Sequence, residues 1–195
     1  MRRSRIVALV GIAWGLAGAV PSSGALRLAD VSGHLAIGFT HLTSSDTTST
    51  PAGSLSIAGG VDVPVSTRVR AGIGVGYHLL GSRTLTQGSL ASGLDYSVFE
   101  VLALVHWAPL DRGPHLIVSG GPGLFSAKAS LAATSVGLAF IPQAIEETRA
   151  GGALTVAIMR RRPSPVRVGI ELGVRVVPLE STTWTLASAR IAMRY

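Results

Sequence analysis

The chain is 195 residues long, 47% hydrophobic and 14% charged, with a formal net charge of +7 and no cysteine. The absence of cysteine excludes a disulfide framework and thiolate chemistry. The basic residues are almost all scattered arginines rather than the basic face that nucleic-acid binding needs, so nucleic acid is not an expected partner.

The N-terminal segment has the three parts of a secretory signal. Three arginines stand among the first five residues, an apolar run covers residues 6–20, and small residues follow. This pattern predicts a cleaved signal peptide at residues 1–25 and a single mature domain at residues 26–195. The net charge of the mature domain is +4, because the three arginines leave with the signal peptide. A membrane-anchoring helix is the alternative, but the run is shorter than the about 20 residues of a span and Pro21 ends it.

Beyond the signal, apolar residues alternate with small or polar residues at a period of two, and no run long enough for a membrane-spanning helix remains. Such alternation predicts β-strands. The faces of the fifth strand cannot be assigned, because glycine and aliphatic residues occur there at both parities. The predicted strands cover residues 34–42, 54–63, 68–79, 99–107, 115–125, 151–158, 166–176 and 187–195.

The connections between these strands are of two kinds. Compact, proline-bearing turns at residues 64–67, 108–114 and 160–165 alternate with longer stretches rich in serine, threonine and glycine at residues 43–51, 81–93 and 126–148. Short turns at one end and long loops at the other are typical of outer-membrane barrels, and eight is the smallest even number of strands that closes one. The sequence therefore predicts an all-β fold: an eight-stranded antiparallel up-and-down transmembrane β-barrel, preceded by a helical signal peptide.

The composition of the second face decides whether the apolar face points inward, as in a soluble lipocalin-like barrel, or outward into lipid. A water-facing exterior would carry many lysine, glutamate and glutamine side chains. Here the second face is glycine, alanine and serine with scattered arginine and glutamate, which suits a cramped interior. We therefore expect the apolar face to contact lipid and the barrel to be closed. Tyr96 and Trp184 fall on the inward parity and are interpreted as loop residues beyond the bilayer.

The chain resembles the small eight-stranded outer-membrane barrels of the OmpA, OmpX and OmpW kind in three features. These are the terminal alternation that ends at Tyr195, the glycine-rich strand start at residues 119–124, and the eight-segment layout of residues 30–195. The resemblance implies export through the periplasm, a location in the bacterial outer membrane in contact with its lipid, and insertion by the barrel-assembly machinery with Tyr195 as the assembly signal. It also implies a role between structural anchoring, adhesion and the passage of small solutes.

The inward parity carries charges that we interpret as a lumen charge network. Its members are Asp62, Arg68, Arg70, Glu100, Arg167, Glu171, Arg175, Arg190 and Arg194. Buried unpaired charges are costly, so each acid is expected to lie against arginines. This favours a mostly closed lumen and a structural or interaction role. The excess of arginine favours the alternative, a narrow channel or transporter for small anionic or hydrophobic solutes.

The short turn at residues 64–67 predicts the first cross-strand pair of this network. It folds residues of the same face together, so Asp62 should lie opposite Arg68 or Arg70. Cross-strand pairs of opposite charge contribute about 0.2–1 kcal/mol.

The connection near residues 180 and 181 predicts a second pair, Glu171 opposite Arg190. The same register opposes Arg167 to Arg194. Because two like charges across strands repel each other, we expect a slip of two residues, an acid from a third strand, or exposure at the periplasmic rim to relieve this pair.

No pattern for catalysis or metal binding accompanies these charges. The Gly-x-Ser-x-Gly motif of nucleophile turns is absent, and Ser119 is interpreted as a small residue for close backbone packing. None of the five histidines has metal-ligand spacing to another or to an acid, although His34 and His106 fall near the same, periplasmic end of the lumen. We therefore expect no enzyme activity, no cofactor and no metal.

The predicted long loop at residues 126–148 contains an apolar run, Val136–Ile141, where solvent exposure is expected. The run either extends the fifth strand, caps the barrel, or contacts a hydrophobic ligand or a protein partner. The pattern alone leaves these three interpretations open.

Overall fold

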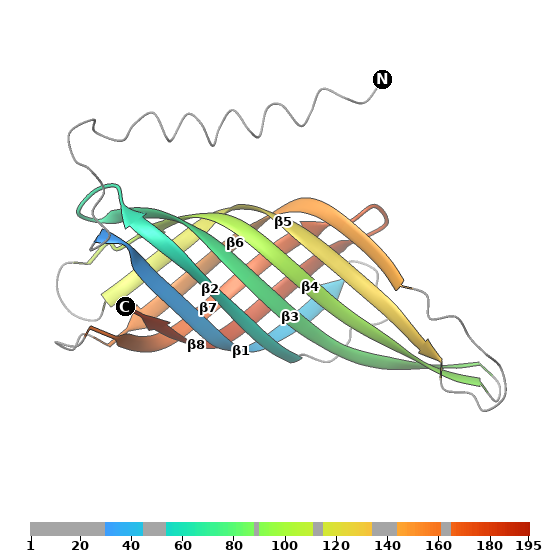
Figure 1. The fold of residues 1–195 in the computed structure, drawn as a ribbon. Coiled ribbons are helices and arrows are strands. Elements are labelled where there is room, and N and C mark those ends of the chain that lie inside the picture. The colour runs from blue at the N-terminus through green and yellow to red at the C-terminus, as the bar shows by residue number, and fades with distance from the viewer. Residues whose placement is uncertain (1–29, 45–53, 88–89, 111–114, 134–143, 161–164) are drawn as a thin grey trace, which may run out of the picture. The chain divides into compact units, whose positions relative to one another are not determined.

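Eight antiparallel strands form a closed barrel in the computed structural model, which describes residues 30–44, 54–87, 90–110, 115–133, 144–160 and 165–195 (Figure 1). The strands are β1 (Ser32–Ser44), β2 (Ser54–Pro64), β3 (Val69–Gln87), β4 (Leu90–Trp107), β5 (His115–Ala133), β6 (Ala144–Met159), β7 (Arg167–Pro178) and β8 (Thr183–Arg194). Each pairs with its sequence neighbours, and β1 closes the barrel on β8. The predicted all-β, up-and-down, eight-stranded barrel is confirmed.

The barrel unit spans Val31–Tyr195. The signal peptide predicted at residues 1–25 lies outside the described residues. In the described part of the chain, no helix is long and apolar enough to cross a membrane.

The two ends of the barrel differ in their connections. At one end the turn between β2 and β3 is closed by a hydrogen bond from the Val65 N–H to the Val69 carbonyl at 2.9 Å, and β8 ends next to the start of β1. Short turns face the periplasm in barrels of this class. We therefore call this the periplasmic end and the opposite end the extracellular end.

Large apolar side chains cover the outside of the barrel. Phe39 is 71% exposed, Ile170 63% and Ile191 59%, and every strand contributes at least one exposed apolar side chain of this kind. So extensive an apolar surface is not found on a soluble monomer, whereas it matches the lipid-facing band of a transmembrane barrel. The outward direction of the apolar face is confirmed.

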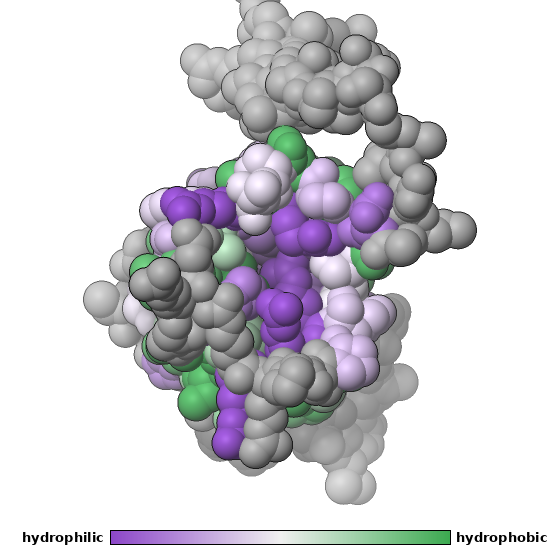
Figure 2. Space-filling model, turned by 90° about the vertical axis from the view of Figure 1, so that its left-hand side faces the viewer, coloured by the Kyte–Doolittle hydropathy of each residue, from purple (hydrophilic) through white to green (hydrophobic). Residues whose placement is uncertain are grey.

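The inward parity fills the lumen, and toward the extracellular end the filling is apolar. Leu102 and Leu104, which interrupt the alternation of β4, are only 4% and 8% exposed and join this cluster. The apolar lumen cluster consists of Leu42, Leu80, Val98, Leu102, Leu104, Phe125, Ala127, Val177, Trp184 and Leu186. An end-on view from the periplasmic side shows hydrophilic residues gathered around the centre of that end instead (Figure 2).

Tyr96 and Trp184 are not the loop residues that the sequence predicted, because they lie on β4 and β8. Trp184 is 9% exposed within the apolar lumen cluster, and the Tyr96 ring meets it edge-on with 6.0 Å between centroids. Their inward parity was therefore a correct indication of their position. The lumen is wide enough at this level to take large rings, and filling it with them removes their apolar surface from water.

Two of the predicted long loops are largely strand. β3 continues to Gln87 and β4 begins at Leu90, where a loop at residues 81–93 was expected, with an irregularity between Leu79 and Ser82. The predicted loop at residues 126–148 likewise contains the ends of β5 and β6. Backbone pairing continues there without the apolar alternation, since strands beyond the bilayer need no lipid-facing side. The apolar run Val136–Ile141 lies outside the described residues.

The structure also assigns the faces of β5. Ile117, Ser119 and Phe125 point into the lumen, and Leu124 points outward. The glycines between them allow close approach of the neighbouring strand, because a Cβ added at Gly121 would lie 1.8 Å from the Ala103 carbonyl oxygen of β4. This contact explains the glycine-rich sequence that obscured the alternation.

Candidate functional site

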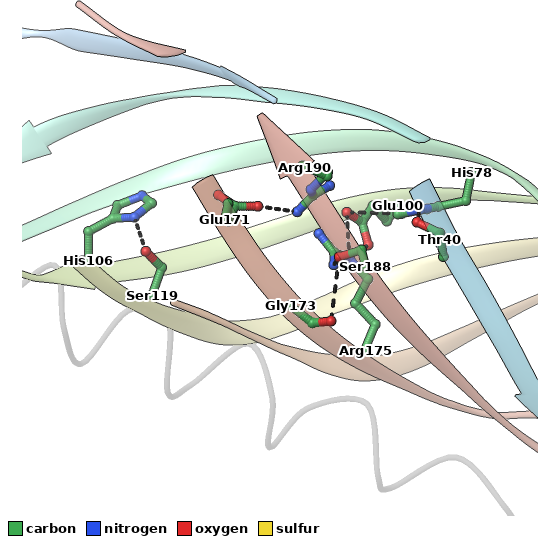
Figure 3. A network of polar contacts seen from close by, with 10 residues as sticks. All are labelled: Thr40, His78, Glu100, His106, Ser119, Glu171, Gly173, Arg175, Ser188 and Arg190. Atoms are coloured by element: carbon green, nitrogen blue, oxygen red, sulfur yellow. Dashed lines mark hydrogen bonds and ion pairs between the residues drawn. The ribbon is translucent and has the colours of Figure 1, made fainter. Parts of the chain in front are cut away.

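A buried ion pair crosses the middle of the lumen between two strands that are not neighbours. Arg175 Nε of β7 donates to both carboxylate oxygens of Glu100 of β4, at 3.0 and 2.7 Å, and both side chains are 1% exposed. Arg175 Nη1 also donates to Ser188 Oγ of β8 at 2.9 Å. His78 Nε2 lies 3.3 Å from Glu100 Oε1 without hydrogen-bond alignment, and its Nδ1 is 3.1 Å from Thr40 Oγ1 (Figure 3). Four strands thus meet at one carboxylate and one guanidinium, and the His78 ring connects β1 to them.

The second acid of the network pairs as the sequence predicts. Glu171 of β7 lies directly opposite Arg190 of β8, and Arg190 Nη2 donates to Glu171 Oε1 (Figure 3). The Arg190 side chain is 2% exposed, and its Nε and Nη1 have no hydrogen-bond partner among the described residues. Its charge therefore depends on Glu171 within a poorly solvated interior.

The third acid, Asp62, collects donors from three strands at the periplasmic end of the lumen. Ser32 Oγ of β1 donates to Asp62 Oδ1 at 2.8 Å, and Arg70 Nε of β3 donates to the same oxygen. Arg194 Nη2 of β8 donates to Oδ2. Arg70 pairs with Asp62 as predicted, but it does not lie opposite it, because the register sets Asp62 opposite Gly72 and Arg70 opposite Pro64. Arg194 is the second arginine on Asp62, although β2 and β8 are not neighbours.

The like-charge pair expected from the register is present and is relieved in two ways. Arg167 of β7 lies opposite Arg194 of β8, with no slip of the register. Arg194 takes an acid from a third strand, Asp62, and Arg167 is exposed at the periplasmic end. Arg68 and Arg167, the other two arginines of the predicted network at this end, are both exposed, and Arg68 precedes β3 in the turn.

The network includes a cluster that sequence spacing could not show. His34 of β1 and His106 of β4 meet edge-on with ring centroids 5.5 Å apart, and one ligand atom each from His34, Asp62 and His106 lie within 4.8 Å of one another. His106 is 5% exposed, and its Nδ1 lies 2.7 Å from Ser119 Oγ. Inward parity and a shared periplasmic level are the sequence signals that group these residues.

The sequence interpreted Ser119 only as a small residue for close backbone packing, but its hydroxyl also contacts the His106 ring. The contact has the form of a nucleophile beside a base, but catalysis by such a pair also requires a group that orients the base. His106 Nε2 has no hydrogen-bond partner among the described residues, and Asp62 is bonded to two arginines instead. The arrangement lacks the third member of a triad.

Two connected levels of space lie on the periplasmic side of the Glu100–Arg175 pair. A cavity of about 390 Å³ at the periplasmic end is lined by Arg70, Arg194 and His106 among others. His106 and Arg194 also line a cavity of about 30 Å³ deeper in the lumen, which reaches Glu100 and Arg175. Beyond these lies the apolar lumen cluster. The open space therefore narrows from the periplasmic end toward the ion pair.

Tyr195, the predicted assembly signal, lies on the seam that closes the barrel. Its N–H donates to the Gly33 carbonyl at 3.1 Å and its carbonyl accepts from the Gly33 N–H at 3.0 Å. A Cβ added at Gly33 would lie 2.3 Å from the Tyr195 ring, so the ring covers this glycine. The residue as a whole is 67% exposed.

Comparison with known proteins identifies the fold. No protein-family model and no curated protein sequence matches the chain. One similar solved structure is that of Ail, the attachment invasion locus protein of Yersinia pestis, in complex with the heparin analogue sucrose octasulfate. The TM-score is 0.57 and the sequence identity 11%, over 85% of this chain and 99% of that chain. The neisserial surface protein A is similar with a TM-score of 0.53 and 11% identity, over 83% and 95%. Together with the apolar outer surface, this fold is that of a transmembrane β-barrel.

Proposed function

We propose that this protein is a closed-lumen outer-membrane barrel with a structural or interaction role. The observation that carries the proposal is the Glu100–Arg175 pair, which joins β4 to β7 across the lumen while both side chains stay 1% exposed. Removing one member of a buried ion pair typically costs about 3–5 kcal/mol, because the other charge is left uncompensated. A solute that separates this pair meets a barrier of that order.

A second layer supports the same proposal. On the extracellular side of the ion pair, Phe125 and Trp184 fill the lumen together with aliphatic side chains and are 0% and 9% exposed. On the periplasmic side, the inner cavity of about 30 Å³ has room for about two water molecules. A conducting path would have to open a charged layer and an apolar layer in series.

The alternative is a narrow channel for small anionic or hydrophobic solutes, and one observation favours its anionic form. The periplasmic cavity is lined by Arg70, Arg167 and Arg194, with no acidic side chain among the described residues of its lining. A positive mouth of this kind concentrates anions. Conduction would still require the Glu100–Arg175 pair to separate.

The interaction part of the proposal concerns the extracellular end. β5 and β6 extend well beyond the last β6–β7 pair, Gly152 with Val176, and frame residues 134–143, which lie outside the described part of the chain. A hydrophobic ligand or protein partner at residues 126–148 stays a prediction based on the apolar run Val136–Ile141. Insertion by the barrel-assembly machinery likewise rests on the resemblance stated above.

Conductance across planar lipid bilayers tests the closed lumen. The purified mature barrel should show no discrete conductance steps under conditions in which a general porin, reconstituted in parallel, shows them. The double variant Glu100→Ala/Arg175→Ala removes the charged layer without leaving a lone charge, and it should stay closed because the apolar lumen cluster is intact.

Discrete conductance of the wild-type protein would contradict the proposal and support the channel. Conductance of the double variant alone would show that the ion pair is a gate and that the apolar lumen cluster does not seal the barrel. A heat-modifiable gel band confirms that each variant is folded before it is measured.

A further inference from the structure

The cavity of about 390 Å³ at the periplasmic end is lined by Arg70, Arg167 and Arg194 and, among the described residues of its lining, by no acidic side chain. Asp62 is the carboxylate that pairs with both Arg70 and Arg194. Arg167 lines the same cavity and lies opposite Arg194 in the β7–β8 register, and no salt bridge to Arg167 occurs among the residues that the structure describes. Arg70 and Arg194 thus share Asp62, and Arg167 has no salt bridge in the described part of the chain. In a concave site with partly apolar walls, such charges are screened less than on an open surface.

A buried hydrogen-bonding atom points to a missing partner at the same place. His106 lines the cavity and is 5% exposed, and its Nδ1 is held by Ser119 Oγ at 2.7 Å. Its Nε2 is buried without a hydrogen-bond partner in the described part of the barrel, and so is His34 Nδ1 beside it. His34 lines the inner cavity of about 30 Å³, whereas His106 lines both cavities. Buried polar atoms without partners are uncommon in folded proteins, so the His106 Nε2 atom indicates a site for a ligand or ordered water.

The charge of that ligand follows from the arginines. His34, Asp62 and His106 form a donor set that a divalent cation could take. Both carboxylate oxygens of Asp62, however, already accept hydrogen bonds from guanidinium groups. A dication would have to displace those bonds and then lie against Arg70 and Arg194. An anion is attracted by the same arginines and can accept a hydrogen bond from an imidazole N–H.

We propose that the periplasmic cavity is a binding site for a small oxyanion, a phosphate or carboxylate group, held by Arg167 and Arg194 with His106 as a hydrogen-bond donor. Arginine suits this role because its planar guanidinium can make two parallel hydrogen bonds to either group. The cavity volume lies within the range of small-molecule sites, so the oxyanion can be part of a larger molecule. Two sources share this chemistry: a soluble periplasmic molecule and the phosphate of a lipid headgroup in the inner leaflet.

Inorganic phosphate is the probe that tests the site. The mature barrel in phosphatidylcholine nanodiscs should bind phosphate saturably, measured by calorimetry and by NMR of the His106 imidazole. Arg167→Gln should weaken binding about tenfold, the loss of about one charge-assisted hydrogen bond. The variant should fold, because Arg167 is exposed and faces a like charge.

Arg160→Gln is the matched control. Arg160 is exposed at the same end, and its substitution by Gln removes the same charge as Arg167→Gln does. It is not among the residues that line the cavity, and its backbone N–H donates to the Val168 carbonyl. Phosphate affinity should be unchanged in this variant. Equal weakening by both substitutions, or no saturable binding by the wild-type protein, would overturn the proposal. So would stoichiometric binding of Zn²⁺ at His34 and His106 without any effect of phosphate.

Nanodiscs that contain phosphatidylglycerol separate the two sources. A lower apparent affinity for phosphate in these discs shows that a lipid headgroup occupies the cavity, and an unchanged affinity points to a soluble molecule; either result supports the oxyanion site. The outcome does not depend on the conductance measurement, because the cavity lies outside the layers that close the lumen. Ser119→Ala, which frees the His106 ring, should weaken binding while Arg160→Gln does not.

Discussion

Glu171 and Arg190 stand directly opposite each other on β7 and β8 and are joined by an ion pair inside the barrel. Their side chains are 12% and 2% exposed, so each charge depends on the other rather than on water. The relationship was predictable because strict alternation sets the face of each residue and the short connection between the strands sets the register.

Charge reversal at this pair gives the first prediction. Glu171→Arg or Arg190→Glu alone should each lower the free energy of unfolding by about 3–5 kcal/mol, because two like charges then meet in a poorly solvated interior. The double swap should recover about 1–3 kcal/mol of the summed losses. Urea-induced unfolding in lipid vesicles, followed by tryptophan fluorescence, measures each value.

The control for this cycle is Arg160→Glu, which reverses an exposed charge at the periplasmic end. It should change the free energy of unfolding by less than about 0.5 kcal/mol. Strictly additive losses in the Glu171 and Arg190 double variant would show that the two charges do not interact.

The sequence predicted the pairs between neighbouring strands and missed the contacts across the lumen. Glu171 opposite Arg190 follows from alternation and turn position. For Asp62 they gave the correct partner, Arg70, but not the register, since Asp62 lies opposite Gly72. Glu100 with Arg175 joins β4 to β7, and Asp62 with Arg194 joins β2 to β8. Such contacts depend on the stagger of the closed barrel and on side-chain rotamers, which a local period of two does not encode.

Sequence alternation also predicted the membrane-embedded parts of the strands better than their ends. The period of two is imposed by lipid on one side and a lumen on the other. β3 and β5 continue beyond the bilayer to Gln87 and Ala133, where neither constraint acts and the backbone pairing of the strands continues. The inward Trp184 was misplaced for a related reason, since the pattern of a strand does not report how wide the lumen is at a given level.

Close packing between β4 and β5 gives the second prediction. Gly121→Ala should cost about 1–3 kcal/mol or prevent folding, because its Cβ would lie 1.8 Å from the Ala103 carbonyl oxygen. Gly152→Ala is the matched control on β6, where the nearest atom to an added Cβ is the Gly121 carbonyl oxygen at 3.9 Å. The control should change stability by less than about 0.5 kcal/mol. Urea midpoints and the heat-modifiable gel shift compare the two, and equal effects would contradict this account of the glycine-rich strand.

Acidification should loosen the extracellular end at Glu147, which lies on β6 beyond the last β6–β7 pair and thus outside the membrane-spanning segment. Its carboxylate accepts hydrogen bonds from the Arg149 side chain and from the Glu180 N–H at 2.9 Å. The hydrogen bond from Arg149 holds the pKa of Glu147 below its ordinary value. The stabilisation is therefore complete above the ordinary carboxyl pKa of about 4.3 and is lost as the pH falls through the lower folded value.

Hydrogen exchange at the Glu180 amide, measured from about pH 6 to about pH 3, checks this effect after correction for the intrinsic pH dependence of exchange. Protection should fall toward the acid end in the wild-type protein. In Glu147→Gln, protection of the Glu180 amide should not fall in this way, because glutamine keeps an acceptor oxygen but has no ionisable group. The same pH profile in both proteins would assign the loss of protection to another group.

The seam between β1 and β8 gives the last prediction, which separates barrel closure from recognition during assembly. Deleting Tyr195 removes two backbone hydrogen bonds to Gly33 together with the aromatic ring. Tyr195→Ala keeps the backbone bonds and removes only the ring of a residue that is 67% exposed, and Tyr195→Phe keeps both the bonds and the ring. If the exposed ring is the assembly signal, Tyr195→Ala should reduce the heat-modifiable fraction in the outer membrane nearly as much as the deletion does, whereas Tyr195→Phe should assemble normally.

Refolding into vesicles, where no assembly machinery is present, should leave Tyr195→Ala close to the wild-type protein, because a largely exposed ring contributes little to packing. Normal assembly of Tyr195→Ala in cells, with a defect confined to the deletion, would assign the role of Tyr195 to backbone closure of the barrel and not to a recognition signal.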